Sequence, residues 1–229
     1  ADLDTRALRW LGEAARRSDQ SGAWPLSARL YDQALDLASA PEHASDRMTF
    51  LVGRAHAHTE MWRLDLARAD ACEASEHAVT TDDAVGRARV ALLEGCIESR
   101  DGNLTAAIER FDDAVGQFDA LGDLQGRADA LRQKGQAALF QNKAAEAELP
   151  IAESLVAFRG SGDRRGEAWA LQNLAWIAFV TGRIEQAELR LGEAFDAFTE
   201  IGDAAGFAWT DGLLAFVRFS QGRFEEATE

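Results

Sequence analysis

The sequence predicts an all-α protein built from consecutive pairs of antiparallel helices. A pattern of aspartate and glycine recurs every 40 residues, without insertion or deletion. Between these markers apolar residues follow helical spacing, and the alternation expected of strands is absent. The chain has only 3 prolines and 1 tyrosine, and alanine is abundant, which is a helical composition. A strict repeat of this length is typical of stacked supersecondary units, because no single unit buries its own apolar face.

Two sets of residues, half a period apart, mark the ends of the predicted helices. The first set pairs each aspartate with a glycine three positions later: Asp83, Asp123, Asp163 and Asp203 with Gly86, Gly126, Gly166 and Gly206. Aspartate is a good N-cap, because its carboxylate accepts from the free N–H groups of the first turn. The second set is Gly22, Gly102, Gly182 and Gly222, with Asn142 in the remaining downstream position. Glycine there closes a helix end, because it adopts the left-handed conformation easily.

Residues 163–202 show how one repeat is built. The first helix begins at Asp163 and ends at Thr181-Gly182. Its apolar positions follow helical spacing: Ala168, Leu171, Leu174, Ala175, Ala178 and Phe179. The second helix runs from about Ile184 to Thr199, and Gly202 ends it. Each repeat is therefore predicted to be two antiparallel helices joined by a tight turn.

The same interpretation, shifted along the chain, predicts eleven helices in a single solenoid domain over residues 1–229, with about five and a half repeats. The sixth second helix would begin near Arg223, and the sequence stops at Glu229. We therefore expect a fragment of a longer protein. The last first helix lacks most of its partner, so its apolar residues are not expected to be fully covered: Leu213, Leu214, Phe216, Val217 and Phe219. Self-association through this C-terminal end is expected.

Small and large residues alternate at positions where the helices should pack. The small positions are Gly95, Gly135, Ala175 and Ala215, and the large ones are Tyr31, Phe111, Ile151 and Leu191. Two positions depart from the pattern. Trp62 occupies a turn position that favours glycine or asparagine, which predicts a turn of different shape. Pro150 falls inside the fourth second helix, which should be kinked there or begin late.

Residues 95–114 carry a family resemblance, through Gly95, Gly102, Ala107, Phe111 and Ala114. A small residue, a glycine turn and then Ala-x3-aromatic-x2-Ala resemble the tetratricopeptide repeat. The 40-residue form with a Gly-Asp linker is similar to arrays in bacterial ATP-binding transcription regulators, ATPase-fused nucleotide cyclases and spindle-orientation scaffolds. WD40 propellers and HEAT units fit less well. The resemblance implies a right-handed superhelix whose concave groove is lined by the first helices.

By this resemblance, defined positions of the first helices form a binding groove. In the middle of the array these are Arg89, Arg132, Gln133, Gln136, Gln172 and Asn173, and towards the C-terminal end Trp169, Trp176, Phe179, Trp209, Phe216 and Phe219. Amides and arginines suit the backbone and carboxylates of an extended peptide, and aromatics suit an apolar side chain or a helix. Alternatively, the amides bond between neighbouring helices and the aromatics are core for further repeats. The two lysines of the family's carboxylate clamp are missing.

Composition and charge indicate which partners, locations and kinds of site to expect. The net charge of −15 disfavours nucleic acid and favours a basic partner. The first residues lack a signal-peptide pattern, the longest apolar run is too short for a membrane span, and the 2 cysteines do not suggest a disulfide scaffold. A cytoplasmic location is expected. The four histidines have no metal-binding spacing and no phosphate-binding loop occurs, so no catalytic residue, cofactor or metal is predicted.

Two classes of function are consistent with these features. The first is a protein- or peptide-binding scaffold module of a larger cytoplasmic signalling or regulatory protein. The alternative is an effector-sensing arm that binds a small molecule and regulates an attached ATPase, cyclase or DNA-binding domain. A deep closed pocket favours the second class, and an open groove favours the first.

Overall fold

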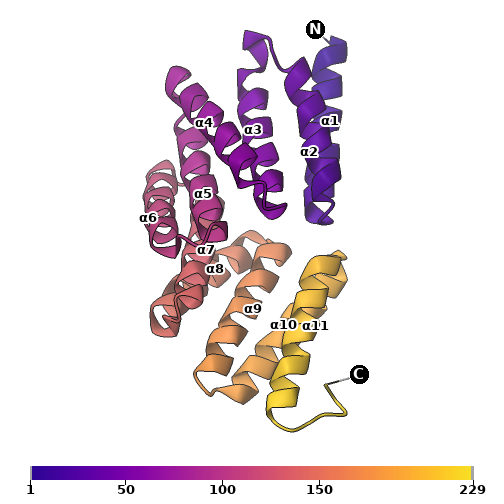
Figure 1. Ribbon diagram of the computed structural model, residues 1–229, viewed down its shortest axis with the longest axis vertical. Helices are drawn as coiled ribbons and strands as arrows, with labels where there is room; N and C mark the ends of the chain where they lie inside the picture. Colours follow the sequence, from indigo (N-terminus) through magenta and orange to yellow (C-terminus); the bar gives the residue numbers. More distant parts are fainter. Residues whose placement is uncertain (1, 228–229) are drawn as a thin grey trace. The chain divides into compact units, whose positions relative to one another are not determined.

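A computed structural model of the chain describes residues 2–227, and this part is helical (Figure 1). Its elements are α1 (Asp2–Gln20), α2 (Trp24–Leu37), the 3-10 helix η1 (Pro41–His43), α3 (Ala44–Glu60), α4 (Leu64–Thr80), α5 (Ala84–Arg100), α6 (Leu104–Leu121), α7 (Leu124–Phe140), α8 (Ala144–Ser161), α9 (Arg164–Val180), α10 (Ile184–Ile201) and α11 (Ala204–Ser220). The described residues thus contain eleven α-helices and no strand, which confirms the predicted all-α class.

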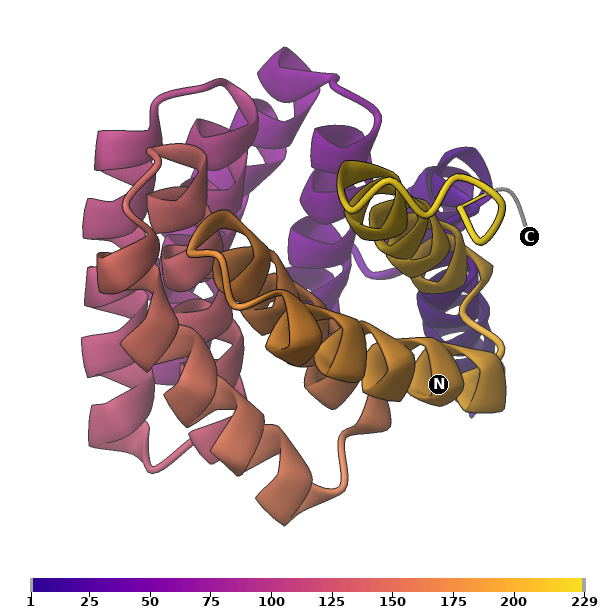
Figure 2. The ribbon, with the colours of Figure 1, turned by 90° about the horizontal axis from the view of Figure 1, so that it is seen from below.

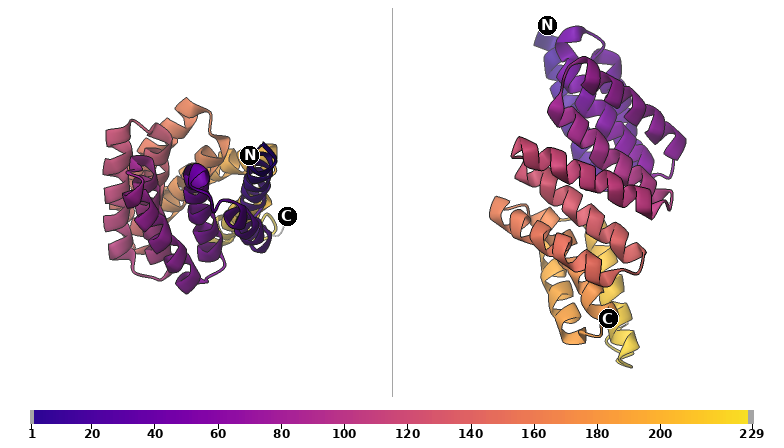
Figure 3. Two further views of the ribbon diagram at one scale, coloured as in Figure 1. Left: turned by 90° about the horizontal axis from the view of Figure 1, so that it is seen from above. Right: turned by 90° about the vertical axis from the view of Figure 1, so that its left-hand side faces the viewer.

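The chain divides into two compact units, Ala1–Asp123 and Leu124–Glu229. The first unit contains the pairs α1/α2, α3/α4 and α5/α6, and the second contains α7/α8, α9/α10 and the single helix α11. Within each unit, successive first helices also touch: α1 contacts α3, α3 contacts α5, α7 contacts α9, and α9 contacts α11. The individual pairs can be followed in Figures 2 and 3. The predicted pairing of helices is therefore confirmed within each unit.

The turns inside the pairs share one backbone geometry. Gly102 and Gly182 have φ angles of +87° and +78°, as predicted. Trp62 also adopts the left-handed conformation, with φ 59°. The amide of Arg63, which follows it, donates to the His58 carbonyl at 2.9 Å, as the amide of Arg183 does to Ala178 at 2.7 Å. The prediction of a differently shaped turn at Trp62 was wrong, because the turn's hydrogen bonds impose the conformation on whichever residue is there.

The joints between repeats combine a cap with a close contact. Asp163 and Asp203 each accept a hydrogen bond from the glycine amide three residues later, both at 2.9 Å. That glycine also makes room for an aromatic ring. A Cβ atom at Gly166 would lie 2.5 Å from Phe158, and one at Gly206 would lie 2.2 Å from Phe198. At α9 and α11 the Gly-Asp-x-x-Gly pattern therefore sets both the start of the helix and its distance from the preceding helix.

The predicted small and large positions meet within the helix pairs. A Cβ atom at Gly95 would lie 2.5 Å from the Phe111 ring, and one at Gly135 would lie 2.3 Å from Ile151. Both large side chains are buried. These contacts confirm that the small residues let paired helices approach closely.

Pro150 does not delay the start of its helix. α8 begins at Ala144, one period before the start of α10 at Ile184, and contains Pro150 in its interior. The alternative in which the helix begins late was wrong. A proline there removes one backbone hydrogen bond, while the flanking residues Ala147 and Ile151 are fully buried and hold the helix in place.

Candidate binding groove

Helix α9 carries two of the predicted groove amides, Gln172 and Asn173. Their exposed fractions are only 7% and 5%. The Nδ2 atom of Asn173 is buried and has no hydrogen-bond partner in the part of the chain that the structure describes. A buried donor without an acceptor costs about 1–3 kcal/mol. Asn173 is therefore a polar group whose presence lowers the stability of the isolated fold.

The other repeats hold different residue types at this position, among them Gly53, Leu93, Gln133 and Leu213. In the first unit Leu93, on α5, stands 80 residues before Asn173. It belongs to a buried apolar cluster with Ala55, Ala67, Ala71 and Ile97. The residues 80 positions after these four are also buried: Gly135, Ala147, Ile151 and Ile177. By this register the Asn173 amide lies in surroundings that suit an apolar side chain.

The groove residues of α7 are more accessible than those of α9. Arg132, Gln133 and Gln136 are half-buried on this helix, which contacts α9. Arg132 and Gln133 already have interaction partners within the chain. The second unit thus places a half-exposed basic and amide surface on the helix next to the buried amides.

Three of the predicted aromatics form one cluster between α9 and α11. The ring centroids of Trp176 and Phe179 are 5.5 Å apart, and that of Phe216 lies 6.3 Å from Trp176 and 5.4 Å from Phe179. Trp176 and Phe179 are half-buried, whereas Phe216 is 50% exposed. Such separations are typical of favourable aromatic pairs. The cluster offers an apolar surface of three rings.

The remaining predicted site residues lie elsewhere. The Trp169 ring packs edge-on against Phe198 at 5.0 Å and belongs to the α9/α10 core. Trp209 is 69% exposed, and Phe219 pairs with Phe224 beyond the end of α11 at 5.3 Å. Arg89 lies in the first unit, exposed on α5. The structure thus gathers the α9 amides, the α7 polar residues and the three-ring cluster within one unit.

The last helix is incompletely covered, as predicted from the repeat count. Val217 is fully buried and Leu213 and Leu214 are half-buried, but Phe216 and Phe219 are 50% and 58% exposed. The turn after α11 still forms: the Arg223 amide donates to the Arg218 carbonyl at 3.0 Å. α11 therefore presents large apolar side chains to solvent.

Sequence reasoning missed a buried ionic cluster in the first unit. Two nitrogens of Arg54 donate to Asp70 at 3.0 and 2.7 Å, and a third donates to Asp32 at 2.7 Å. Nδ1 of His58 lies 3.2 Å from the same Asp70 carboxylate. Burial alone would raise the pKa of Asp70, but hydrogen bonds from His58 and Arg54 outweigh burial and hold it below its usual range. This cluster ties α2, α3 and α4 together.

The same two positions carry the opposite charges one repeat later. Glu94 and Arg110 stand 40 residues after Arg54 and Asp70, with their charged atoms 3.2 Å apart. Burial raises the pKa of Glu94, because the attraction of Arg110 offsets it only in part. The recurring 16-residue spacing of opposite charges was the sequence signal that could have identified both pairs.

Residues 2–227 offer neither a metal site nor a membrane span. No group of three or more His, Cys, Asp or Glu side chains in this range is arranged to hold a metal ion. None of its helices combines the length and apolar character that a membrane crossing requires.

Comparison with known proteins identifies the fold. No protein-family model matches the sequence, and no curated protein sequence matches it. Among solved structures, the apo form of RapI is similar with a TM-score of 0.72 and 11% identity, over 97% of this chain and 80% of that one. A Rap protein complexed with Competence and Sporulation Factor has a TM-score of 0.68 and 16% identity, over 99% and 67%.

A third similar structure names the repeat in its description. It is a signal transduction ATPase with numerous domains from Pyrococcus horikoshii, with a tetratricopeptide repeat sensor, at a TM-score of 0.69 and 15% identity. The similarity covers 95% of this chain but only 34% of that protein. Together with the paired helices and glycine turns, these matches show that the chain has a tetratricopeptide-like fold. At such low identity they describe the fold alone.

Proposed function

We propose that this chain is a protein- or peptide-binding module of a larger cytoplasmic signalling or regulatory protein. Binding takes place in the groove lined by the first helices, with its centre on α7, α9 and α11. The observation that carries the proposal is the buried Nδ2 donor of Asn173, which has no acceptor among the described residues. To reach a ligand carbonyl or carboxylate oxygen, this buried donor would have to turn towards the groove, and binding would then recover free energy that the unliganded fold lacks.

The surrounding side chains suit a peptide better than a small polar solute. Gln136 provides a half-exposed amide donor on α7, and Arg132, which already has a partner within the chain, adds a positive charge beside it; both suit backbone carbonyls and carboxylates. Trp176, Phe179 and Phe216 provide an apolar surface for a side chain of the same ligand. The net charge of −15 would steer a basic partner towards the module and repel nucleic acid. The Rap structure with Competence and Sporulation Factor shows that a similar fold is compatible with a bound partner.

A displayed peptide library, selected against the whole chain, tests this proposal. Selected peptides should bind the Asn173→Ala variant roughly tenfold more weakly in calorimetry, because one buried hydrogen bond is lost. Asn142→Gly is the matched control: Asn142 is exposed in the α7–α8 turn, and glycine accepts its positive φ. Equal affinity of both variants for every selected peptide would refute the groove assignment.

One observation favours a second candidate, the effector-sensing arm. The similar signal transduction ATPase carries a tetratricopeptide repeat sensor, and this chain covers only 34% of that protein. The chain would then bind a small effector and regulate an attached ATPase, cyclase or DNA-binding domain. The domain composition of the full-length protein separates the two: an attached ATPase or DNA-binding domain favours the sensor.

The proposal includes self-association through the C-terminal end. Phe216 and Phe219 are large apolar side chains that are at least half exposed on α11. Such surfaces tend to find a partner when they extend over several side chains. Light scattering should therefore detect dimers of the chain, and the double change Phe216→Ser and Phe219→Ser should reduce them. A strictly monomeric chain at high concentration would contradict this part of the proposal.

A further inference from the structure

Two joints of the second unit, α8/α9 and α10/α11, share the same backbone design. Phe158 and Phe198 are both fully buried and lie against the glycine of the following cap. Asp163 and Asp203 both cap the next helix through that glycine's amide at 2.9 Å. Any difference between the joints therefore comes from the side chains around them.

At the α8/α9 joint those side chains form an ion cluster. Nε of Arg159 donates to Glu167 at 2.8 Å, and Nη1 of Arg164 donates to the other oxygen of the same carboxylate at 2.6 Å. Burial alone would raise the pKa of Glu167, but these two arginines hold it below its usual range. The cluster covers the surface next to Phe158.

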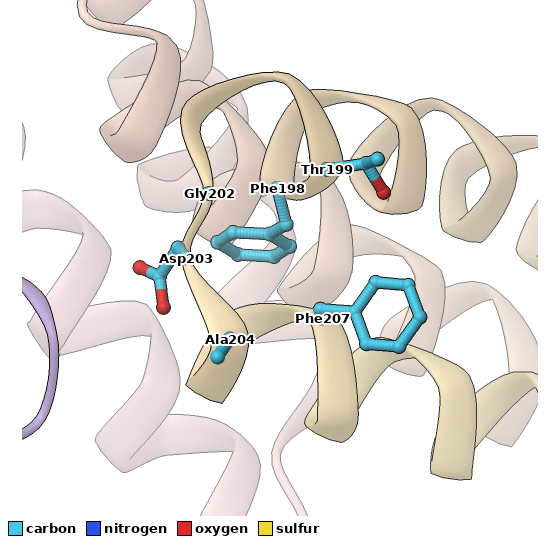
Figure 4. Close-up of a pocket in the computed structure, with 6 residues that line it drawn as sticks. All are labelled: Phe198, Thr199, Gly202, Asp203, Ala204 and Phe207. Atoms are coloured by element: carbon cyan, nitrogen blue, oxygen red, sulfur yellow. The ribbon is translucent and has the colours of Figure 1, made fainter.

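At the α10/α11 joint the three equivalent positions are uncharged. Thr199 replaces Arg159, Ala204 replaces Arg164 and Phe207 replaces Glu167, each one period later in the sequence numbering. A hollow of about 230 Å³, open to solvent, remains in their place. It is lined by Phe198, Thr199, Gly202, Asp203, Ala204 and Phe207. Figure 4 shows the rings of Phe198, from α10, and Phe207, from α11, facing this hollow.

The hollow suits one large apolar side chain. A closed cavity of about 150 Å³ in another protein binds benzene, so a hollow of about 230 Å³ has room for a phenyl ring or a leucine side chain. Phe207 is 38% exposed and is supported from behind by Phe195, with ring centroids 4.6 Å apart. An aromatic wall of this kind is available without rearrangement of the helices.

Carboxylates outnumber arginines near the hollow: Arg165 pairs with Asp203, and Arg164 pairs with Glu200. Asp203 is already used, because it accepts from the Gly206 amide and from Arg165 at 2.8 Å, and its carboxylate points away from the two rings (Figure 4). Asp196 lies one helical turn before Thr199, and Asp211 lies one turn after Phe207, so each shares a helix face with a residue that lines the hollow. Neither of these two carboxylates forms an ion pair with any other described residue.

We propose that the α10/α11 hollow is a second docking site, distinct from the groove, for a protein segment that inserts one large apolar side chain flanked by lysine or arginine. The apolar side chain would pack against the exposed Phe207 ring, beside Thr199 and Ala204. The flanking basic groups would lie near Asp196 and Asp211. The α8/α9 joint cannot accept the same segment, because its arginines and Glu167 occupy the equivalent space.

Methyl NMR of the whole chain tests this site with two matched short peptides. One has a single phenylalanine between lysines, and the other has the same phenylalanine between glutamates. The lysine peptide should shift the methyl signals of Thr199 and Ala204. The glutamate peptide should bind at least roughly fivefold more weakly. Asn173→Ala should leave this binding unchanged, so the result does not depend on the groove.

Exchanging residues between the two joints provides the decisive variants. The triple change Thr199→Arg, Ala204→Arg and Phe207→Glu copies the α8/α9 ion cluster and should weaken binding of the lysine peptide at least roughly tenfold. Circular dichroism should show the same helix content, because the α8/α9 joint already tolerates this set. The same affinity in the variant, equal affinity for both peptides, or no shift at Thr199 and Ala204 would each overturn the proposal.

Discussion

Leu93 in the first unit and Asn173 in the second stand at the same point of the repeat, 80 residues apart. Leu93 packs in an apolar cluster with Ala55, Ala67, Ala71 and Ile97. Asn173 is equally buried, yet its amide nitrogen lacks a partner among the described residues. The backbone frame accepts either residue, so the choice between them reflects another demand. Under the proposed function, that demand is ligand binding.

The two units also differ in whether their buried polar side chains have hydrogen-bond partners. In the first unit the buried side chains of His58 and Asp70 are paired with each other, and Arg54 completes the cluster. In the second unit four side chains on α9, α10 and α11 bury a polar atom without a partner among the described residues: Asn173, Gln186, Thr210 and Arg218. Unsatisfied buried groups are rare in native proteins, and each calls for an explanation. The two units therefore differ in how completely their buried polar side chains are satisfied.

The largest expected effect concerns the ionic cluster of the first unit. Asp70→Ala should lower the free energy of unfolding by about 3 kcal/mol at pH 7, because Arg54 and His58 lose their buried partner. Denaturant titration measures this change. Asp32→Ala is the control, since the Asp32 side chain is 54% exposed and should contribute less than about 1 kcal/mol.

The same variant should show a defined pH dependence. The pKa of Asp70 is lower in the folded chain than its usual value: hydrogen bonds from His58 and Arg54 outweigh the effect of burial. Its contribution is therefore complete above about pH 4, the range of a free aspartate, and is lost as the pH falls through the lower folded value. The stability difference between the parent chain and Asp70→Ala should shrink below about pH 4. A difference that stays constant into strong acid would show that the charge of Asp70 is unimportant.

Replacing the turn glycines should destabilise both units alike, in contrast to the buried polar groups. Gly102→Val and Gly182→Val should each cost more than about 1 kcal/mol, since both residues have positive φ. Gly116 and Gly192, inside α6 and α10, have open space around an added Cβ and no positive φ. Valine at these control positions should be nearly neutral. If denaturant titration found the turn variants as stable as the controls, the two units would not share the same turn conformation.

The helix ends and turns could mostly be predicted from the sequence, because the residues that set them are close together in the chain. The Asp163 carboxylate caps α9 by accepting a hydrogen bond from the Gly166 amide, three residues later. Gly182 forms the turn after α9 because it adopts a positive φ. The prediction for Trp62 was wrong, because the hydrogen bonds of the turn override the preference of its residues. Local signals of this kind need no knowledge of which helices meet.

The candidate sites could be predicted only in part, because they depend on contacts between repeats. The family resemblance placed Asn173 on the groove, but its burial and unpaired donor emerge only when neighbouring helices are packed around it. The bonds of Arg54 to Asp70 and Asp32 join three helices and were not anticipated. Phe207 stands where Glu167 stands one repeat earlier, so the α10/α11 joint lacks the ion cluster of the α8/α9 joint. The sequence alone does not show that these residues meet at a joint.

The most direct test of a binding role for Asn173 exchanges the residue types at positions 93 and 173. Asn173→Leu should raise the free energy of unfolding by about 1 kcal/mol in denaturant titration, because it removes an unsatisfied buried donor. Leu93→Asn should lower it by more than that, since it places such a donor in an apolar cluster. Peptides selected on the parent chain should bind the more stable Asn173→Leu variant less tightly. If Asn173→Leu instead destabilised the chain, Asn173 would be a satisfied structural residue, and the proposed binding role would be wrong.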